Sequence, residues 1–327
     1  MRCDAQPRGS ILIMTTWLLA IVALLALGIS HRGQLEVRLV SYDVATAQTR
    51  LAALAGVQRA LEAVAHDTNA FDAWNEPWAS SSKTFERHSV RPGQTTFTVS
   101  HETPAVAATV TLYGAEDESS RLNLNSAAAD VIAALPGIGN DVAQSLVAFR
   151  DAAPHPAEDA YYGSLAPPYA AKRAVFESLA EVALVRGMTP ERFAVVARYG
   201  TVYPKLGSPV NVNTAPREVL LALGLSPALV NGILAYRLGG DGRPGTDDDG
   251  VFQQTTFDPA QWSWMSPENA ARLNALMASH ALDVRSSAIR IRAEGRTEEG
   301  AVTVVAEAVV LRGAPGTPPH VVAWQWQ

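Results

Sequence analysis

A glycine-rich acidic loop holds the densest group of side chains that could do chemistry. Residues 239–250 read GGDGRPGTDDDG, and the carboxylates belong to Asp241, Asp247, Asp248 and Asp249. Calcium prefers carboxylate and carbonyl oxygens, and glycines let the backbone curl so that its carbonyls can join the carboxylates. The loop therefore predicts a calcium site, although no glutamate closes it as in an EF-hand. A solvated acidic turn is the alternative.

Other chemical motifs are weak or missing in the sequence. Gly240, Gly242 and Gly245 formally match a dinucleotide fingerprint, but Pro244 and the lack of a preceding strand exclude that use. No His-Glu-x-x-His pair, Gly-x-Ser-x-Gly elbow or Walker loop occurs. We therefore expect that the protein is not an enzyme.

The turn Leu135-Pro136-Gly137-Ile138-Gly139 resembles that of a helix-hairpin-helix, a module that often binds DNA backbones. Glycine amides beside a helix N-terminus can hold a phosphate. Here Asp141 sits where a phosphate would approach, no lysine follows, and the net charge of the chain is -6. DNA affinity needs several basic residues. We therefore expect a turn that packs two helices, and no nucleic-acid partner.

An internal repeat surrounds these features. Leu122-Asn123-Leu124-Asn125-Ser126-Ala127 is echoed by Val210-Asn211-Val212-Asn213-Thr214-Ala215, and a helix start follows each copy. A tight turn and an aromatic-arginine pair then recur in both copies, at Gly137-Ile138-Gly139 with Phe149-Arg150 and at Gly224-Leu225-Ser226 with Tyr236-Arg237. The repeat predicts a duplicated helical hairpin, each copy entered through a short extended segment.

These features are held by a chain that begins with a membrane-spanning stretch. Ser10 to Ser30 contains no charged residue and has the length of roughly 20 residues that a helix needs to cross a bilayer. Arg2 and Arg8 precede it, so the N-terminus is expected in the cytoplasm and the bulk of the chain in the periplasm. This predicts a single-pass inner-membrane protein.

The residues on either side of the span suggest how it is processed. A cleaved secretory signal would need small residues after Ile29, and the sequence offers no such site. Arg8-Gly9 instead directly precedes the span, a layout similar to a type IV prepilin leader. We therefore expect a prepilin peptidase to cut between Gly9 and Ser10, which removes Cys3, the single cysteine of the chain.

Helical periodicity continues beyond the span and should stop near His66, before Asp67-Thr68-Asn69. The helix is amphipathic, and we expect the face between Leu51 and Val64 to pair with helices of partner subunits. Strand patterns follow at 94–100 and 108–113, which we expect to form an antiparallel pair. A short strand is expected at 121–125, and strand patterns return at 288–293 and 302–310.

The predicted fold class is α+β. A long N-terminal helix packs on an antiparallel pilin-like sheet, and a large duplicated all-α insert of the helix-hairpin-helix or SAM-like type interrupts the sheet. The expected boundaries are a leader at 1–9, a transmembrane helix at 10–30, the first part of the pilin-like domain at 31–125, the insert at 126–283, and the last strands and tail at 284–327.

These pieces together resemble the family of the type II secretion minor pseudopilin K, also called general secretion pathway protein K. The resemblance rests on motifs spread over almost the whole chain: Arg8-Gly9, Asp72 to Trp78, Leu122 to Asn125, Leu135 to Gly139, Gly187 to Glu191 and Pro209 to Pro216. It implies a subunit at the tip of a periplasmic pseudopilus, which supports export of folded proteins across the outer membrane.

The same resemblance implies partners. These are the minor pseudopilins I and J, together with the prepilin peptidase that processes the leader. Family members have been seen with calcium, which favours calcium at the acidic loop. A membrane-anchored DNA-uptake protein that uses the helical hairpins is the alternative function.

Met14 fits a tip position. It would be the fifth mature residue, where most pilin-like subunits have a glutamate. A carboxylate in lipid is costly unless the N-terminal amine of the next subunit pairs with it. Met14 cannot form that pair, so this ion pair would not hold the subunit beneath another one.

Overall fold

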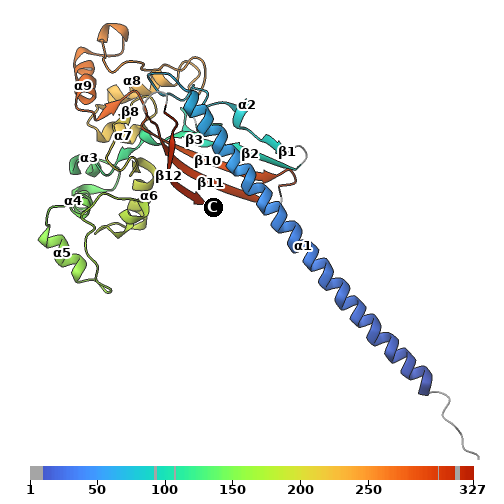
Figure 1. The fold of residues 1–327 in the computed structure, drawn as a ribbon. Helices are drawn as coiled ribbons and strands as arrows, with labels where there is room; N and C mark the ends of the chain where they lie inside the picture. The colour runs from blue at the N-terminus through green and yellow to red at the C-terminus, as the bar shows by residue number, and fades with distance from the viewer. Residues whose placement is uncertain (1–9, 92–93, 107, 301, 314–316) are drawn as a thin grey trace, which may run out of the picture.

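The computed structural model describes residues 10–91, 94–106, 108–300, 302–313 and 317–327. Its first element is the helix α1, Ser10–His66, which extends away from the rest of the molecule (Figure 1). The apolar half of α1 is fully exposed, and it is the one helix of the described residues that is long and apolar enough to cross a membrane. α1 is therefore consistent with a single membrane anchor, and its end at His66 confirms the predicted stop.

The second half of α1 lies across an antiparallel sheet (Figure 1). The strand order is β1-β2-β10-β11-β12, and β5 pairs with β10 beyond the end of β2. The strands are β1 His88–Arg91, β2 Thr95–Val99, β5 Glu116–Asp117, β10 Ala288–Thr297, β11 Thr303–Leu311 and β12 His320–Trp326. The two central strands, β10 and β11, thus come from the end of the chain.

Small residues bring the helix close to the sheet. A Cβ atom at Gly295 would lie only 2.0 Å from the carbonyl oxygen of Thr49, so any larger residue would push α1 away. Val57 and Val64 are buried in the core that α1 forms with the sheet. The sheet of the same chain thus covers Val57 and Val64, whereas Leu51 of the same stretch is 63% exposed, so pairing of this stretch with partner helices stays a prediction.

The predicted pairing of 94–100 with 108–113 is also wrong. β2 pairs with β1 and β10, whereas β4, Thr109–Leu112, pairs with β3, His101–Pro104, in a separate hairpin. Strand periodicity indicates that a segment is extended but does not identify its neighbour. β10 offers β2 a long partner, and β4 finds a local one.

The middle of the chain folds around a second core, which is mostly helical. Its helices are α3 Ala129–Ala133, α4 Gly139–Arg150, α5 Pro156–Gly163, α6 Pro190–Tyr199, α7 Arg217–Ala222, α8 Pro227–Arg237 and α9 Pro267–Ala278. The short helix α2, Ser82–Phe85, belongs to the sheet side. Proline in the first turn and a side-chain cap from Thr189, Ser226 or Ser266 start α6, α8 and α9.

Short strands enter this helical region where the sequence repeat predicts extended segments. β6, Leu122–Asn123, pairs in parallel with β7, Gly200–Thr201, and β8, Val210–Asn211, pairs in parallel with β9, Leu282–Asp283. The fold is therefore α+β, with a long N-terminal helix on an antiparallel sheet and a helical region beside it.

Candidate metal site and the junction between the two cores

A buried group of acidic side chains lies just after α1. One oxygen from each of Asp67, Asp72 and Glu76 lies within 4.8 Å of the others, and no other such group of three or more His, Cys, Asp or Glu occurs among the described residues. We call these three residues the acidic triad. Hard cations prefer carboxylate oxygens, so the acidic triad could bind a metal ion.

Protein groups already surround the triad. The guanidinium of Arg312 lies 2.8 Å from Oδ2 of Asp67 and 2.6 Å from Oδ1 of Asp72. Oδ2 of Asp72 accepts a hydrogen bond from the backbone N–H of Ser286 at 2.8 Å. Glu76 accepts hydrogen bonds from the side chain of Asn69, the backbone N–H of Ala73 and the indole N–H of Trp78. A metal ion would therefore have to displace Arg312.

Burial also changes the protonation of the triad. It raises the pKa of Asp72 to about 8, although Arg312 acts in the opposite direction. Burial likewise raises the pKa of Glu76. Asp72 consequently holds its proton at neutral pH, and metal binding would also have to release that proton. The result is a clasp in which Arg312, which follows β11, is held against the segment that follows α1.

The acidic loop, residues 239–250, lies elsewhere, beside the β3–β4 hairpin. Asp241, Asp247 and Asp248 are exposed and Asp249 is half-buried. Oδ2 of Asp248 accepts hydrogen bonds from the backbone N–H groups of Gly240, at 2.6 Å, and Asp241, at 3.1 Å. The loop is thus closed on itself by its own carboxylates.

Asp249 makes similar contacts. Its Oδ2 accepts the backbone N–H of Gly245 at 2.7 Å and that of Thr246 at 3.3 Å. The Thr246 hydroxyl lies between Asp248 Oδ1, at 2.7 Å, and Asp249 Oδ1, at 3.3 Å. Burial raises the pKa of Asp249 to about 6, whereas the bond from Thr246 lowers the pKa of Asp248.

The structure therefore brings Asp248 and Asp249 together but does not gather three carboxylates of the loop into one group. Calcium at Asp241, Asp247, Asp248 and Asp249 stays a prediction. The predicted cleavage between Gly9 and Ser10 also stays a prediction: Gly9 lies outside the described residues, and Ser10 is the first residue of α1.

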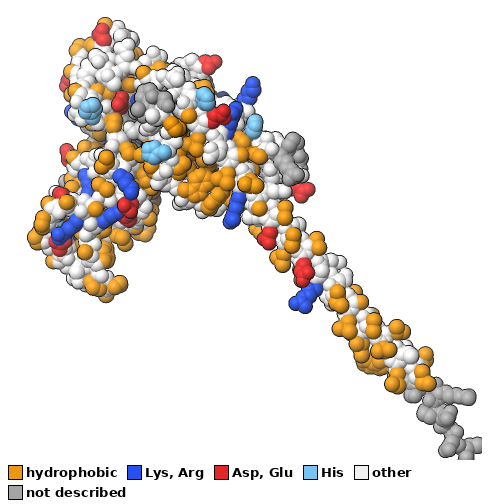
Figure 2. All heavy atoms as spheres, in the orientation of Figure 1, with side chains coloured by type: hydrophobic (Ala, Val, Ile, Leu, Met, Phe, Trp, Pro, Cys, Tyr) orange, Lys and Arg blue, Asp and Glu red, His pale blue; other side chains and the backbone are white. Residues whose placement is uncertain are grey.

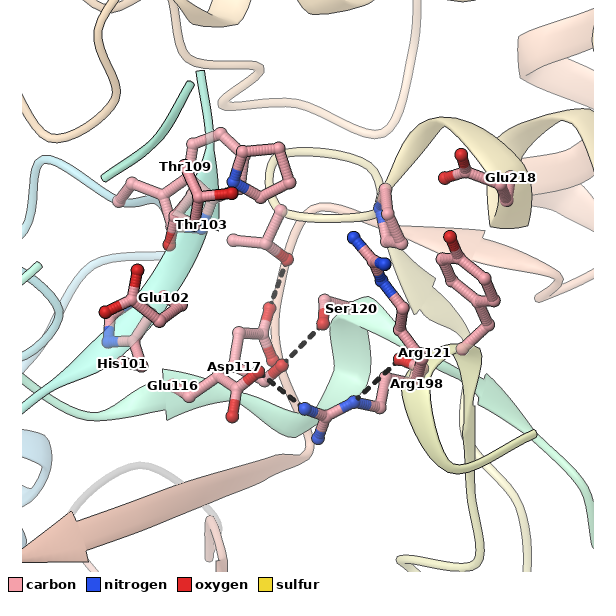
Figure 3. A pocket seen from close by; sticks show the side chains of 15 residues that line it. His101, Glu102, Thr103, Thr109, Glu116, Asp117, Ser120, Arg121, Arg198 and Glu218 are labelled. Atoms are coloured by element: carbon pink, nitrogen blue, oxygen red, sulfur yellow. Dashed lines mark hydrogen bonds and ion pairs between the residues drawn. The ribbon is translucent and has the colours of Figure 1, made fainter. Parts of the chain in front are cut away.

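The junction between the two cores contains a cavity of about 310 Å³ (Figure 3). Asp117 is buried beside it and accepts a hydrogen bond from Asn211 at 2.9 Å and another from the hydroxyl of Thr214. Asn211 also donates to Ser286 and to the backbone carbonyl of Asp72. Burial raises the pKa of Asp117. One buried network thus joins the start of the second repeat copy to the sheet.

A second contact across the junction is ionic. Glu118 is fully buried and lies 2.7 Å from Arg290 of β10, and it also pairs with Arg121. The Thr201 hydroxyl donates to Glu118 at 2.5 Å. Burial alone would raise the pKa of Glu118, but the two arginines outweigh burial and hold it at about 2. These buried bonds fix the helical region against the sheet.

The asparagines of the two repeat copies make matching contacts. Oδ1 of Asn125 accepts the N–H of Phe176 at 2.8 Å, and Oδ1 of Asn213 accepts the N–H of Phe252 at 2.8 Å. Asn123 accepts the N–H of Asn125, and Asn211 accepts that of Asn213. In each copy the second asparagine therefore clamps a distant loop.

The acidic triad is the feature that the sequence did not reveal. In the sequence, the stretch from Asp72 to Trp78 is only one of the motifs that carry the family resemblance. Three acids close together after a helix end were the available signal. Ser286 and Arg312, which complete the group, lie far along the chain, so nothing local indicates them.

Comparisons with known proteins agree with this architecture. Residues 120–205 match the family described as "Type II secretion system (T2SS), protein K". A similar solved structure is the GspK-GspI-GspJ complex from the type 2 secretion system of enterotoxigenic Escherichia coli, with a TM-score of 0.60 and 16% identity over 89% of this chain and 99% of that one. A comparison with curated protein sequences gives no significant match.

The fold shared with that structure is a long N-terminal helix on an antiparallel sheet, with a helical region beside the sheet. The matched segment spans β6 to β7, which is the first repeat copy with its enclosing loops. The family match therefore covers the first part of the helical region and includes neither α1 nor a strand of the main sheet.

Proposed function

We propose that the chain is a minor pseudopilin of a type II secretion system, which caps the tip of the periplasmic pseudopilus and supports export of folded proteins. The observation that carries this proposal is the family match of residues 120–205, set in a chain whose helix and sheet have the pilin-like arrangement. The similar GspK chain was solved in a complex with GspI and GspJ, so we propose the corresponding I and J subunits as partners.

The expected domain boundaries lie near the division between the two cores. Residues 31–125 and 284–327 supply the core that α1 forms with the sheet. Residues 126–283 supply most of the helical core, to which Leu122, Leu124 and Val284 also contribute. The matched bonds of Asn125 and Asn213 support an origin of the insert by duplication of one helical hairpin.

The proposed function also includes cleavage of the leader and an orientation in the membrane. A prepilin peptidase cuts between Gly9 and Ser10 on the cytoplasmic side of the inner membrane, and the remainder of the chain is periplasmic. Without a carboxylate at Met14, α1 has no charge in the bilayer for a neighbouring amine to neutralise, which suits a tip subunit. N-terminal sequencing of membrane-extracted protein should begin at Ser10; a start at Met1 would contradict processing.

Calcium at the acidic loop is also part of the proposal. Asp241 and Asp247 are exposed and open to an ion, and hydrogen bonds already orient Asp248 and Asp249. In the acidic triad, by contrast, Arg312 and a proton on Asp72 already balance charge. A weak site suffices in the periplasm, where calcium is more available than in the cytoplasm.

Co-purification tests the assignment. The full chain is expressed with the I and J subunits of the same system, extracted in detergent and separated by size. We expect all three proteins to elute together. If the chain elutes alone but binds duplex DNA at low salt, the DNA-uptake function replaces this one.

A further inference from the structure

The last strand of the sheet, β12, leaves one edge open. It pairs with β11 along its inner edge, and no described residue pairs with its outer edge. Gln327 and Val305 exchange both backbone hydrogen bonds, at 2.9 and 3.2 Å. Hydrogen-bonded and non-hydrogen-bonded pairs alternate along an antiparallel ladder, and the residues of a non-hydrogen-bonded pair point their N–H and C=O groups away from each other. Trp326, opposite Ala306, and Trp324, opposite Ala308, therefore present these groups to the open edge.

The side chains of the same two residues form an apolar surface. Ala306 and Ala308 are buried under α1, so Trp324 and Trp326, which face them in register, lie on the helix side of the sheet. The main contacts of α1 are with β2, β10 and β11, so the helix covers this flank only in part. The two indoles meet edge to face, and they remain 38% and 41% exposed. Figure 2 shows hydrophobic side chains gathered where β12 lies beside α1.

The end of this edge around Trp324 and Trp326 lacks the usual protection against association. β12 reads HVVAWQW, with no lysine, arginine, acid or proline. Exposed, uncharged edge strands readily pair with another chain, and proteins normally block them with charges, prolines or bulges. The β11–β12 ladder is irregular between Val309 and Val310, but it keeps a regular register where Trp324 and Trp326 face Ala308 and Ala306. The opposite edge of the same sheet, β1, is only four residues long, contains Arg91 and is irregular between Ser89 and Arg91. The regular end of β12, at Trp324 and Trp326, is therefore the edge better suited to pairing.

A single charge defines the rim of this surface. Arg50 of α1 lies over the Trp326 ring, with its guanidinium carbon 6.0 Å from the ring centroid. Within the described part of the chain Arg50 forms no ion pair. A cation beside an apolar strand edge favours a partner that brings an acidic side chain to this position.

We propose that β12 is an interaction edge onto which a partner pseudopilin adds an extended strand, with apolar side chains over Trp324 and Trp326 and an acidic residue facing Arg50. This inference rests on the proposed function, because the partner is the I or J subunit of the same system. Strand addition gains main-chain hydrogen bonds along the edge, and the indoles select the side chains. The sheet would then continue from one subunit into the next.

Hydrogen exchange distinguishes strand addition from docking on the face alone. The full chain in detergent is compared with its complex with I and J, and the peptide that contains β12 is fragmented to resolve single amides. Strand addition should slow exchange of the Trp324 and Trp326 amides by at least about tenfold, because they become hydrogen-bonded. A helix that covered only the indoles would leave these two amides exchanging as in the free chain, which would overturn the inference.

Two lysine variants test the same edge. Trp324→Lys places a charge on the apolar face, and we expect at least about a tenfold loss of affinity for the partner. Gln325→Lys is the matched control: it adds the same charge to the same strand, but on the opposite face near Glu307, where Gln325 donates to Glu307 at 2.9 Å. The control should change affinity by less than about twofold. Equal losses in both variants would overturn the inference.

The remaining outcomes are also decisive. A wild-type complex with unprotected Trp324 and Trp326 amides leaves the proposed function standing and removes the interaction edge. Protection that appears at high concentration of the chain alone, with a dimer in sedimentation, would identify a second copy as the occupant and contradict the assignment to I or J. Failure of the wild-type chain to bind I and J would remove both proposals.

Discussion

The acidic loop and the acidic triad both bring carboxylates close together, and they reduce the resulting repulsion in opposite ways. The loop keeps Asp241, Asp247 and Asp248 in water, where repulsion is weak, and ties its carboxylates to its own backbone N–H groups. The triad is buried and depends on a cation from a distant part of the chain, Arg312. An acidic cluster that is conspicuous in a sequence is thus open to an ion, whereas the inconspicuous cluster closes the fold.

Their protonation differs accordingly. Burial raises the pKa of Asp72 to about 8, so the triad holds a proton at neutral pH. In the loop, burial raises the pKa of Asp249 to about 6, while the Thr246 hydroxyl lowers the pKa of Asp248. Asp248 and Asp249 are therefore mostly ionised at neutral pH, as calcium ligands must be.

The largest expected effect comes from removing the cation of the triad. Arg312→Ala leaves the Asp67 carboxylate without its cation and the protonated Asp72 without a neighbour, and removing one partner of a buried ion pair costs about 3–5 kcal/mol. Urea unfolding of the full chain in detergent measures the loss. Arg296→Ala is the control, because Arg296 is exposed and its ion pair with Glu294 is long, at 3.5 Å. It should cost about 0–1 kcal/mol; equal costs would show that Arg312 is not a clasp.

A smaller effect should follow pH. The folded chain holds the Asp72 proton more tightly than the unfolded chain does, because the pKa rises from 3.8 to about 8. The stability from this proton is fully present below pH 3.8 and is lost as the pH rises through 8. As the pH rises from 3.8 to 8, the free energy of unfolding of the wild type should fall relative to that of Asp72→Asn, which cannot ionise. A constant difference across a pH series of unfolding curves would contradict the raised pKa.

The loop should respond to pH in the opposite sense and more weakly. Asp249 must ionise to bind calcium, and its pKa is about 6. Competition with this proton should weaken calcium binding about tenfold at one pH unit below the pKa. Titrations of calcium at pH 5 and pH 7 measure the change. Asp249→Asn, which cannot take up the proton, should bind weakly and show no such dependence.

The sequence predicted the elements better than their partners. The stop of α1 at His66 was predictable because Asp67-Thr68-Asn69 breaks a helix, and β10 and β11 were predictable from their β-branched residues. The partner of β2 was not, because it lies in β10, far along the chain. Local periodicity contains no information on such long-range register.

The candidate sites differ in the same way: a site made of contiguous residues was predictable, and a site assembled from distant residues was not. The acidic loop was predictable because its glycines and aspartates are contiguous. The triad was not, because Asp72 meets Ser286 across 214 residues and its cation is later still. The open edge of β12 also depends on which strand pairs with which, so composition alone could not distinguish Trp324 from a core tryptophan such as Trp78.

Calcium-dependent melting tests the contrast between the two clusters most directly. Melting of the full chain in detergent is recorded in calcium and in chelator for the wild type, for Asp247→Ala with Asp249→Ala, and for Asp141→Ala, an exposed acid outside both clusters. Calcium at ten times its Kd should stabilise the wild type by about 1.4 kcal/mol, a shift of roughly 3–6 °C, and magnesium should do so less.

We expect the shift to vanish in the loop variant and to persist in Asp141→Ala. We also expect the shift to persist in Asp67→Asn, because Arg312 and the Asp72 proton already balance the charge of the triad. A shift that survives in the loop variant and disappears in Asp67→Asn would place the ion at the triad and contradict the account.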